Sequence, residues 1–467
     1  MPVDSVRLPH VTHDAVVIVP GIMGSRLVET ATGTVVWGLD PKVYVDAWLT
    51  GGPLRRMRLD EEERAGRYGR IRADQLIQAP SWFPVLRGVE PYTELVNAVR
   101  KVLADPAALK PFPYDWRLPV AYNAERLAEK AMDHLKGWRD TPAHKAAQRM
   151  HPTGRPARLV IVAHSMGGLL ARRLTLVPGV AEEIRAVVTL GTPFHGSVKA
   201  VTMLSSGRGM SPPLPPDRTA ELVAGMPGMY DLLPWYSCVD ERDSVRYLDR
   251  SDIAGFGGDP ELFDAAWTAY HQDKAATLPG HRLVVGTAQP TPQSIRVVAG
   301  TAEPRYEECW FRDGMVLRQN RWGDGTVSRG SAELPGSAPV YWAQQHAALA
   351  RTSESIRYVL EVVRERDPNL LGPPLGAERG TGLDVPDTPV VAGQEWTATV
   401  TGVPHARAAK CFVVDGVTGR HVDKVPLVRR DDVHVVRIRL PRPGLFRIVV
   451  DGGGTSAVSQ LVLAEHP

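Results

Sequence analysis

A serine in the segment AHSMGG stands where a nucleophile can be held. Ser165 follows an apolar run at 158–163 and precedes a segment with helical leucine spacing. A serine on a sharp strand-to-helix turn keeps its hydroxyl clear of the sheet, and its neighbours must be small because the turn is crowded. Ala163 replaces the first glycine of this nucleophile elbow, which is a mild departure. The pattern favours a nucleophile over an ordinary serine at a helix start.

A nucleophilic serine needs a base, and the base needs a carboxylate to orient it. In one widespread arrangement these three residues follow in the order serine, acid, histidine. His346 is the one histidine between residue 282 and a Pro/Gly-rich stretch that begins near 368. Two aspartates precede it there: Asp313 in a hairpin-turn sequence, and Asp324 in a glycine-flanked loop. We favour Asp324 as the acid and keep Asp313 as the alternative.

Backbone amides that could stabilise an oxyanion are expected in two loops. Met166 directly follows the serine at a helix start, so its N–H is one candidate. The segment VPGIMGS follows the first apolar run, and its glycines would let N–H groups face the site. Ile22 is the favoured donor of this loop and Met23 the next. The same glycines also suit a plain turn, and the segment lacks the ending of a phosphate loop.

A third loop, GTPFHGS, follows the next apolar run and contains another histidine. His195 competes for the role of base, but it precedes the acid in the chain. We interpret His195 and Phe194 as walls of a substrate pocket, together with Met23 and His164. No metal or cofactor is expected, because no second carboxylate is spaced to join Asp324.

Short apolar runs alternate with helix-like segments over the first 360 residues. Continuous β-branched runs are typical of strands that are buried on both faces of a parallel sheet. The alternation predicts an α/β fold of the α/β-hydrolase type, with cap or lid insertions. The expected strands are 14–19, 158–163, 185–190 and 282–287, and the expected helices are 121–147 and 345–365.

The alternation lapses twice, and the composition changes near the end of the chain. We expect cap or lid insertions at about 28–110 and 198–280 within a catalytic domain at 1–367. The second insertion is rich in methionine, and its methionines either line a pocket for acyl chains or fill a core. A linker is expected at 368–387. Alternating runs between turn signals then predict a small all-β, Ig-like sandwich at 388–467.

The composition excludes several classes of protein. The 467 residues are 43% hydrophobic and 23% charged, which is typical of globular proteins. Lys+Arg 55 against Asp+Glu 52 gives a net charge of +3, so nucleic acid is not an expected partner. The cysteines Cys238, Cys309 and Cys411 have no metal-like spacing and leave at least one thiol free. The opening residues do not look like a secretory signal, and no apolar run could span a membrane, so we expect a cytoplasmic protein.

Five segments together resemble the lecithin:cholesterol acyltransferase family of α/β-hydrolases. That family includes lysosomal phospholipase A2-type enzymes and plant phospholipid:diacylglycerol acyltransferases. The matching segments are VVIVPGIMGSRL (16–27), PYDWR (113–117), VIVAHSMGG (160–168), LGTPFHGSVK (190–199) and GDGTV (323–327). They come in the family's order, and the resemblance covers roughly residues 14–360. It implies Ser165 as nucleophile, Asp324 as acid, His346 as base, and the amides of Ile22 and Met166 as the oxyanion hole.

The chain departs from the family in three places. We expect neither the disulfides nor the signal peptides of the extracellular and lysosomal relatives. Residues 28–80, where those relatives keep a membrane-contacting subdomain, do not match, and the β-rich tail lies outside the resemblance. We expect Asp115 and Arg117 of PYDWR to form a buried ion pair.

The resemblance implies acyl transfer through a serine ester. The expected substrates are lipid esters, as for a phospholipase, lipase or O-acyltransferase, with transient contact to a membrane surface. One alternative is a broad-specificity carboxylesterase. Another is an intracellular phospholipase effector that is activated by a protein partner docked on the β domain. An inactive scaffold is disfavoured because all three members of the triad are present.

Overall fold

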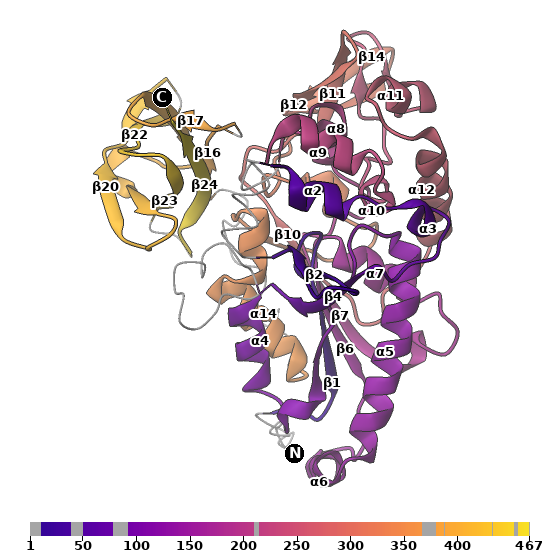
Figure 1. The fold of residues 1–467 in the computed structure, drawn as a ribbon. Helices are drawn as coiled ribbons and strands as arrows, with labels where there is room; N and C mark the ends of the chain where they lie inside the picture. Colours follow the sequence, from indigo (N-terminus) through magenta and orange to yellow (C-terminus); the bar gives the residue numbers. More distant parts are fainter. Residues whose placement is uncertain are drawn as a thin grey trace.

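A six-stranded parallel sheet forms the centre of the larger part of the molecule (Figure 1). The structure is a computed structural model that describes residues 11–38, 50–77, 92–209, 214–366, 380–386, 388–431, 433–452 and 456–466. The strand order is β15-β10-β7-β6-β1-β5, and every neighbouring pair is parallel. The strands are β1 (Ala15–Val19), β5 (Leu109–Pro111), β6 (Leu159–His164), β7 (Ile184–Leu190), β10 (Arg282–Gly286) and β15 (Val340–Trp342).

Helices cover both faces of this sheet. Figure 1 shows α4 (Thr93–Arg100) and α14 (Ser353–Val363) on one side, and α5 (Val120–Asp140) and α7 (Gly167–Leu174) on the other. All residues of β1 and β6 are buried, as expected for β-branched strands between two helical layers. The expected α/β-hydrolase architecture is therefore confirmed, and the four expected strands are present within one or two residues.

The helix expected at 121–147 is two helices, so this expectation is wrong. α5 ends at Asp140, and α6 (Pro142–Met150) begins two residues later. Thr141 is extended, with φ −71° and ψ 147°, because the residue before a proline avoids the helical region. Its side chain accepts a hydrogen bond from the His144 amide, so Thr141 caps the second helix.

Residues 28–110 are only partly an insertion. An antiparallel sheet of β2 (Ser25–Glu29), β3 (Val35–Trp37) and β4 (Ile71–Leu76) lies beside α2 (Gly52–Met57) and α3 (Glu61–Arg64). However, α4 and β5 belong to the central layers, which corrects the expectation of a cap over the whole range. Residues 39–49 and 78–91 of this range lie outside the described residues.

The second insertion is mainly helical. Its elements are α8 (Val198–Ser206), α9 (Pro216–Val223), α10 (Pro227–Tyr230), β8 (Val239–Asp240), β9 (Val245–Arg246), α11 (Arg250–Gly255) and α12 (Pro260–Asp273). Met226 and Met229 are buried, and Met203 packs against the same core. Met210 lies outside the described residues. The described methionines thus fit the alternative in which they fill a core.

The strands that follow α12 extend this region before β15. β11 (Ser294–Val298) and β12 (Thr301–Arg305) join β8 and β9 in a four-stranded sheet. β13 (Glu308–Arg312) and β14 (Met315–Gln319) form a separate hairpin, whose turn holds Asp313 at φ +52°. Asp313 is exposed there, so the acid that was kept as the alternative is a turn residue.

The C-terminal part is all β, as expected. One sheet has the order β16-β18-β22-β21 and the other β17-β24-β23-β19-β20, and the two share a hydrophobic core of their own. Their strands are β16 (Gly382–Asp384), β17 (Val390–Val391), β18 (Glu395–Thr401), β19 (Lys410–Asp415), β20 (His421–Val425), β21 (Val428–Arg430), β22 (Val433–Arg439), β23 (Gly444–Asp451) and β24 (Val458–Glu465). β16 falls inside the range expected as a linker, because Leu383 packs in the β core.

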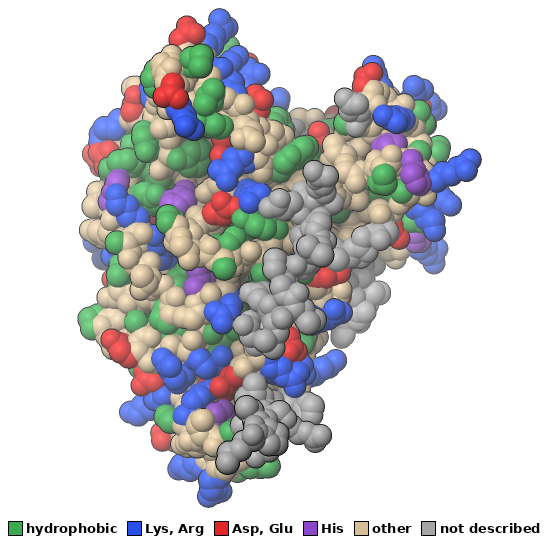
Figure 2. All heavy atoms as spheres, turned by 180° about the vertical axis from the view of Figure 1, so that it is seen from behind, with side chains coloured by type: hydrophobic (Ala, Val, Ile, Leu, Met, Phe, Trp, Pro, Cys, Tyr) green, Lys and Arg blue, Asp and Glu red, His purple; other side chains and the backbone are tan. Residues whose placement is uncertain are grey.

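The surface carries both signs of charge. Figure 2 shows Lys and Arg side chains interspersed with Asp and Glu over the face opposite to that of Figure 1. This mixture agrees with the small net charge of +3. Within the described ranges, no helix is long and apolar enough to cross a membrane.

Candidate active site

The expected nucleophile lies at the carboxyl edge of the sheet, between β6 and α7. Ser165 has a φ of +54°, a left-handed conformation that non-glycine residues rarely adopt. Its amide donates to the Leu190 carbonyl at 2.9 Å, which fixes the turn against the end of β7. Gly168 leaves room for Thr192, because a Cβ there would overlap the Thr192 side chain. A strained serine on a tight strand-to-helix turn is the geometry of a nucleophile elbow.

The structure brings Ser165, His346 and Asp324 into one hydrogen-bonded row. His346 Nε2 lies 2.8 Å from Ser165 Oγ, and His346 Nδ1 lies 2.7 Å from Asp324 Oδ2. The Asp324 side chain is 1% exposed, and its Oδ1 accepts from the amides of Thr326 and Val327 at 2.9 and 2.7 Å. These bonds fix the carboxylate beside His346, whose other ring nitrogen faces the Ser165 hydroxyl.

The loop after β1 lies directly over the nucleophile. A Cβ on Gly21 would stand 2.7 Å from Ser165 Cβ, so only glycine fits there. Met23 has a φ of +62°, and its carbonyl accepts from Trp37 Nε1 at 2.9 Å. In the part of the chain that the structure describes, the amides of Ile22 and Met166 form no hydrogen bond. Both amides are therefore available to an incoming oxygen.

A chain of hydrogen bonds behind Ser165 connects this loop with the His346 loop. The Gly21 amide donates to Tyr92 Oη at 2.7 Å, and Tyr92 Oη lies 2.9 Å from His164 Nδ1. His164 Nε2 lies 3.1 Å from the His346 carbonyl. Burial, together with the charge of nearby His346, lowers the pKa of His164 to about 3, so this imidazole is neutral. Neutral His164 accepts at Nδ1 from Tyr92 and donates from Nε2 to His346.

His164 therefore lies in a buried network rather than in a pocket wall. Sequence reasoning missed Tyr92, which precedes His164 by 72 residues and belongs to no catalytic motif. Its buried hydroxyl at the start of α4 gives no signal in the sequence.

Phe194 and His195 have partners other than the triad. Phe194 is 1% exposed, and its ring contacts His281 edge-on at 5.8 Å. His195 Nδ1 lies 2.8 Å from Tyr270 Oη on α12. Burial lowers the pKa of His195, and the charge of Arg172 lowers it further. His195 thus connects the loop after β7 to the helical insertion and forms no hydrogen bond to Ser165 within the described chain.

The PYDWR segment contributes a buried ion pair, with one acid that the sequence did not reveal. Arg117 is fully buried, and its Nη2 lies 2.6 Å from Asp115 Oδ2 and 2.8 Å from Glu63 Oε1. Arg117 Nη1 also donates to the Met57 carbonyl at 2.9 Å. The pair therefore fastens α2 and α3 to the segment that follows β5.

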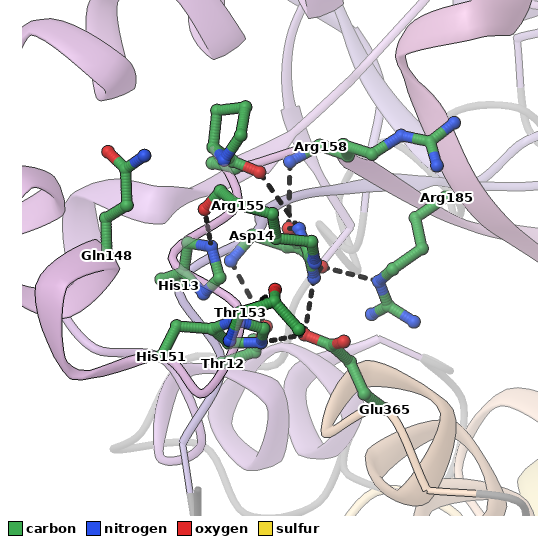
Figure 3. A network of polar contacts seen from close by, with 12 residues as sticks. Thr12, His13, Asp14, Gln148, His151, Thr153, Arg155, Arg158, Arg185 and Glu365 are labelled. Carbon is green, nitrogen blue, oxygen red and sulfur yellow. Dashed lines mark hydrogen bonds and ion pairs between the residues drawn. The ribbon is translucent and has the colours of Figure 1, made fainter. Parts of the chain in front are cut away.

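A second polar cluster, drawn in Figure 3, surrounds the residues just before β1. His13, His151 and Glu365 are close enough to hold a metal ion. However, the Thr153 amide donates to His151 Nδ1, which places the proton on Nε2, toward Glu365 Oε1 at 3.3 Å. The same Glu365 oxygen accepts from Arg155. The side chains of His151 and Glu365 therefore already have hydrogen-bond partners within the cluster. We assign the cluster to an ion-pair network that joins the residues before β1 to the end of α14.

The fold is that of an α/β-hydrolase, and Ser165, His346 and Asp324 form a hydrogen-bonded row at the carboxyl edge of its sheet. The family model described as Lecithin:cholesterol acyltransferase matches residues 48–255, which confirms the resemblance found in the sequence and supports an enzyme of the esterase or lipase class. The match includes Ser165 and Met166. Asp324 and His346 lie beyond it, so their assignment depends on sequence order and geometry.

Among the solved structures that are similar to this chain, the first of the following three shares its fold. A chain from the crystal structure of the Tle4-Tli4 complex is 16% identical, with a TM-score of 0.51 over 75% of this chain and 98% of that chain. The mature Bacillus licheniformis lipase BlEst2 is 13% identical, with a TM-score of 0.34 over 75% and 91%. Phospholipase PlaB from Legionella pneumophila is 10% identical, with a TM-score of 0.30 over 96% and 90%. A search of curated proteins found no match.

Proposed function

We propose that the chain is a serine acyl-ester hydrolase or O-acyltransferase that acts on lipid esters. The observation that carries this proposal is the hydrogen-bonded row of Ser165, His346 and Asp324 at the carboxyl edge of the sheet. The family match supports lipid esters as the substrate class.

The reaction proceeds through an acyl-enzyme. His346 Nε2 removes the Ser165 proton as Oγ attacks the ester carbonyl, and Asp324 keeps the ring oriented and stabilises its positive charge. The amides of Ile22 and Met166 stabilise the oxyanion, each lowering the barrier by on the order of 3 kcal/mol. His346 then returns the proton to the leaving alcohol. Water or a second alcohol, deprotonated by His346, releases the acyl group.

Lipid mass spectrometry on mixed phospholipid vesicles tests the proposal, with and without a long-chain alcohol. Wild type should release lysophospholipid and fatty acid, or form new esters with the alcohol. Ser165→Ala should lower turnover at least about 10³-fold because the nucleophile is absent. Ser244→Ala, an exposed serine in the helical insertion, is the matched control and should retain wild-type turnover.

The remaining outcomes separate the alternatives. Lipid turnover that persists in Ser165→Ala would exclude this site. Cleavage of short soluble esters with no lipid product would indicate a broad-specificity carboxylesterase. Lipid cleavage that appears only after addition of a protein partner would indicate a partner-activated phospholipase.

A further inference from the structure

The C-terminal β region, residues 380–466, is fastened to the main domain beside the loops that carry Asp324 and His346. We propose that this contact holds the acid and base loops in their catalytic geometry, so that the β region is part of the catalytic apparatus and not a separate docking module. The inference rests on the proposed function, because it assigns a positioning role toward the same triad.

Gln289 connects three segments at this contact. It is fully buried just after β10. Its backbone N–H donates to the carbonyl of Gly323, the residue before Asp324, at 3.0 Å. Its side-chain Oε1 accepts from the Leu383 amide at 3.2 Å and from Gln345 Nε2 at 2.8 Å. Its Nε2 donates to the Thr381 carbonyl at 3.0 Å. The Gln289 side chain thus joins Gln345, beside His346, to β16, and the Gln289 backbone binds the loop that contains Asp324.

Gln344 makes a second attachment, two residues before the base. It is 2% exposed, and its Nε2 donates to the Ser456 and Ala457 carbonyls at 2.9 and 3.3 Å. Its Oε1 accepts from the amide of Gln345 at 3.3 Å. The segment that leads into His346 is therefore bound by the residues just before β24 as well as by β16.

Two glycines of the β region lie so close to the main domain that there is no room for a side chain at either position. A Cβ on Gly382 would overlap the Ala288 carbonyl, and a Cβ on Gly380 would overlap the Ala343 side chain. Ala288 immediately precedes Gln289, and Ala343 immediately precedes Gln344. β16 and the residues just before it therefore lie directly against the two segments that precede Gln289 and Gln344.

The contact couples docking of the β region to the geometry of the triad. When the β region is docked, the buried side-chain NH2 groups of Gln289 and Gln344 donate hydrogen bonds to backbone carbonyls of that region. Separation would remove these partners and expose the two side chains to water, so the β region would no longer fix their positions. The segments 323–327 and 344–347 would then rearrange, and the distances within the triad would change.

Two substitutions in the full chain test the proposal. Gly382→Val places a side chain against Ala288, and Gln344→Ala removes the bonds to Ser456 and Ala457. With a soluble short-chain ester, both should lower kcat about tenfold or more and leave KM within about twofold, as expected for lost transition-state geometry. Labelling of Ser165 by a fluorophosphonate should slow by a similar factor. Gln394→Ala, an exposed glutamine of the same β region, is the matched control and should match wild type.

Hydrogen exchange of peptides covering 323–327 and 344–348 supplies a readout that is independent of activity. Both segments should exchange faster in the two variants and remain protected in Gln394→Ala. Faster exchange with full kcat would overturn the proposal, and so would a lower kcat with unchanged exchange. Wild type that neither cleaves esters nor reacts with the fluorophosphonate would refute the proposed function, whereas the exchange data would still decide whether the β region holds these loops.

Discussion

Tyr92 ties the loop over the nucleophile to the histidine beside it. Its hydroxyl accepts from the Gly21 amide and donates to the neutral His164, whose Nε2 reaches the His346 carbonyl. The loop after β1 and the loop of His346 are thus connected through Tyr92 and His164. Since Gly21 touches Ser165, a shift of this chain would move the Ile22 amide relative to the attacked carbonyl.

Tyr92→Phe should lower kcat about tenfold with little change in KM. The substitution leaves the buried Gly21 amide without its acceptor, which typically costs about 1–3 kcal/mol. Initial rates on a soluble ester measure the effect, and Tyr247→Phe, at a tyrosine that is 50% exposed, is the control. A wild-type kcat in Tyr92→Phe would contradict a positioning role for the hydroxyl.

The hydrogen-bonded row of Ser165, His346 and Asp324 could be predicted from the sequence, whereas the hydrogen bonds of Tyr92 and the two glutamines could not. Chain order together with the turn residues around Asp324 and Asp313 was sufficient to select the acid that the structure places beside His346. Tyr92, Gln289 and Gln344 form buried hydrogen bonds whose partners include residues 72, 92 and 112 positions away, respectively. Such pairings depend on the folded chain and have no local pattern.

At the scale of elements, Asp14 anchors the start of β1 to three other segments (Figure 3). Its carboxylate accepts from Arg155 and from the Arg158 amide before β6, and it also binds Arg185 of β7. Arg185 in turn donates to the carbonyls of Val362 and Val363, where α14 ends. Burial acts to raise the pKa of Asp14, but the hydrogen bond from Arg155 and the two arginine charges outweigh it and lower the pKa to about 2.

Asp14→Asn should destabilise the protein by about 3 kcal/mol at neutral pH, because the fully buried carboxylate that pairs with half-buried Arg155 and Arg185 is lost. The folded pKa lies below the reference value of 3.8, so the ion pairs contribute fully above about pH 4 and lose their effect as the pH falls toward 2. Urea unfolding at several pH values should show a constant deficit near neutrality that narrows below about pH 4. Asp313→Asn, in the exposed hairpin turn, is the control. A deficit of equal size at acidic and neutral pH would show that the charge is not its source.

The main strands of the central sheet could be predicted because continuous runs of β-branched residues are typical of strands buried on both faces of a parallel sheet. The division of α5 from α6 was missed, although Pro142 marks it in the sequence. The apolar spacing continued across Thr141, and the cap became apparent only in the extended conformation of that residue. β5 and α4 were missed because β5 is a three-residue edge strand within a long irregular stretch.

At the scale of the whole molecule, the chain has two separate hydrophobic cores, one in the main domain and one in the β region. Much of the contact between them consists of hydrogen bonds and closely packed backbone. Differential scanning calorimetry should therefore give a calorimetric enthalpy larger than the van't Hoff enthalpy, as expected when two units unfold separately. Gly382→Val should move the two transitions further apart. A single two-state transition in both proteins would contradict this expectation.

The presence of a β-rich C-terminal part could be predicted from alternation and turn signals. Its start could not, because β16 comes before the expected boundary and its contacts with residues 288 and 343 depend on the folded main domain.

Most of the hydrogen bonds that fasten the β region end on its main-chain atoms. Gln289 and Gln344 bind carbonyls of Thr381, Ser456 and Ala457 and the amide of Leu383, and no side chain of the β region is needed for these bonds. In evolutionary terms, side chains of the β region other than Ser456 and Ser459, which bond Glu354 and Arg351, can diverge while the main-chain contacts to Gln289 and Gln344 are inherited through backbone shape. Gly380 and Gly382 are the positions at which selection should tolerate the least change.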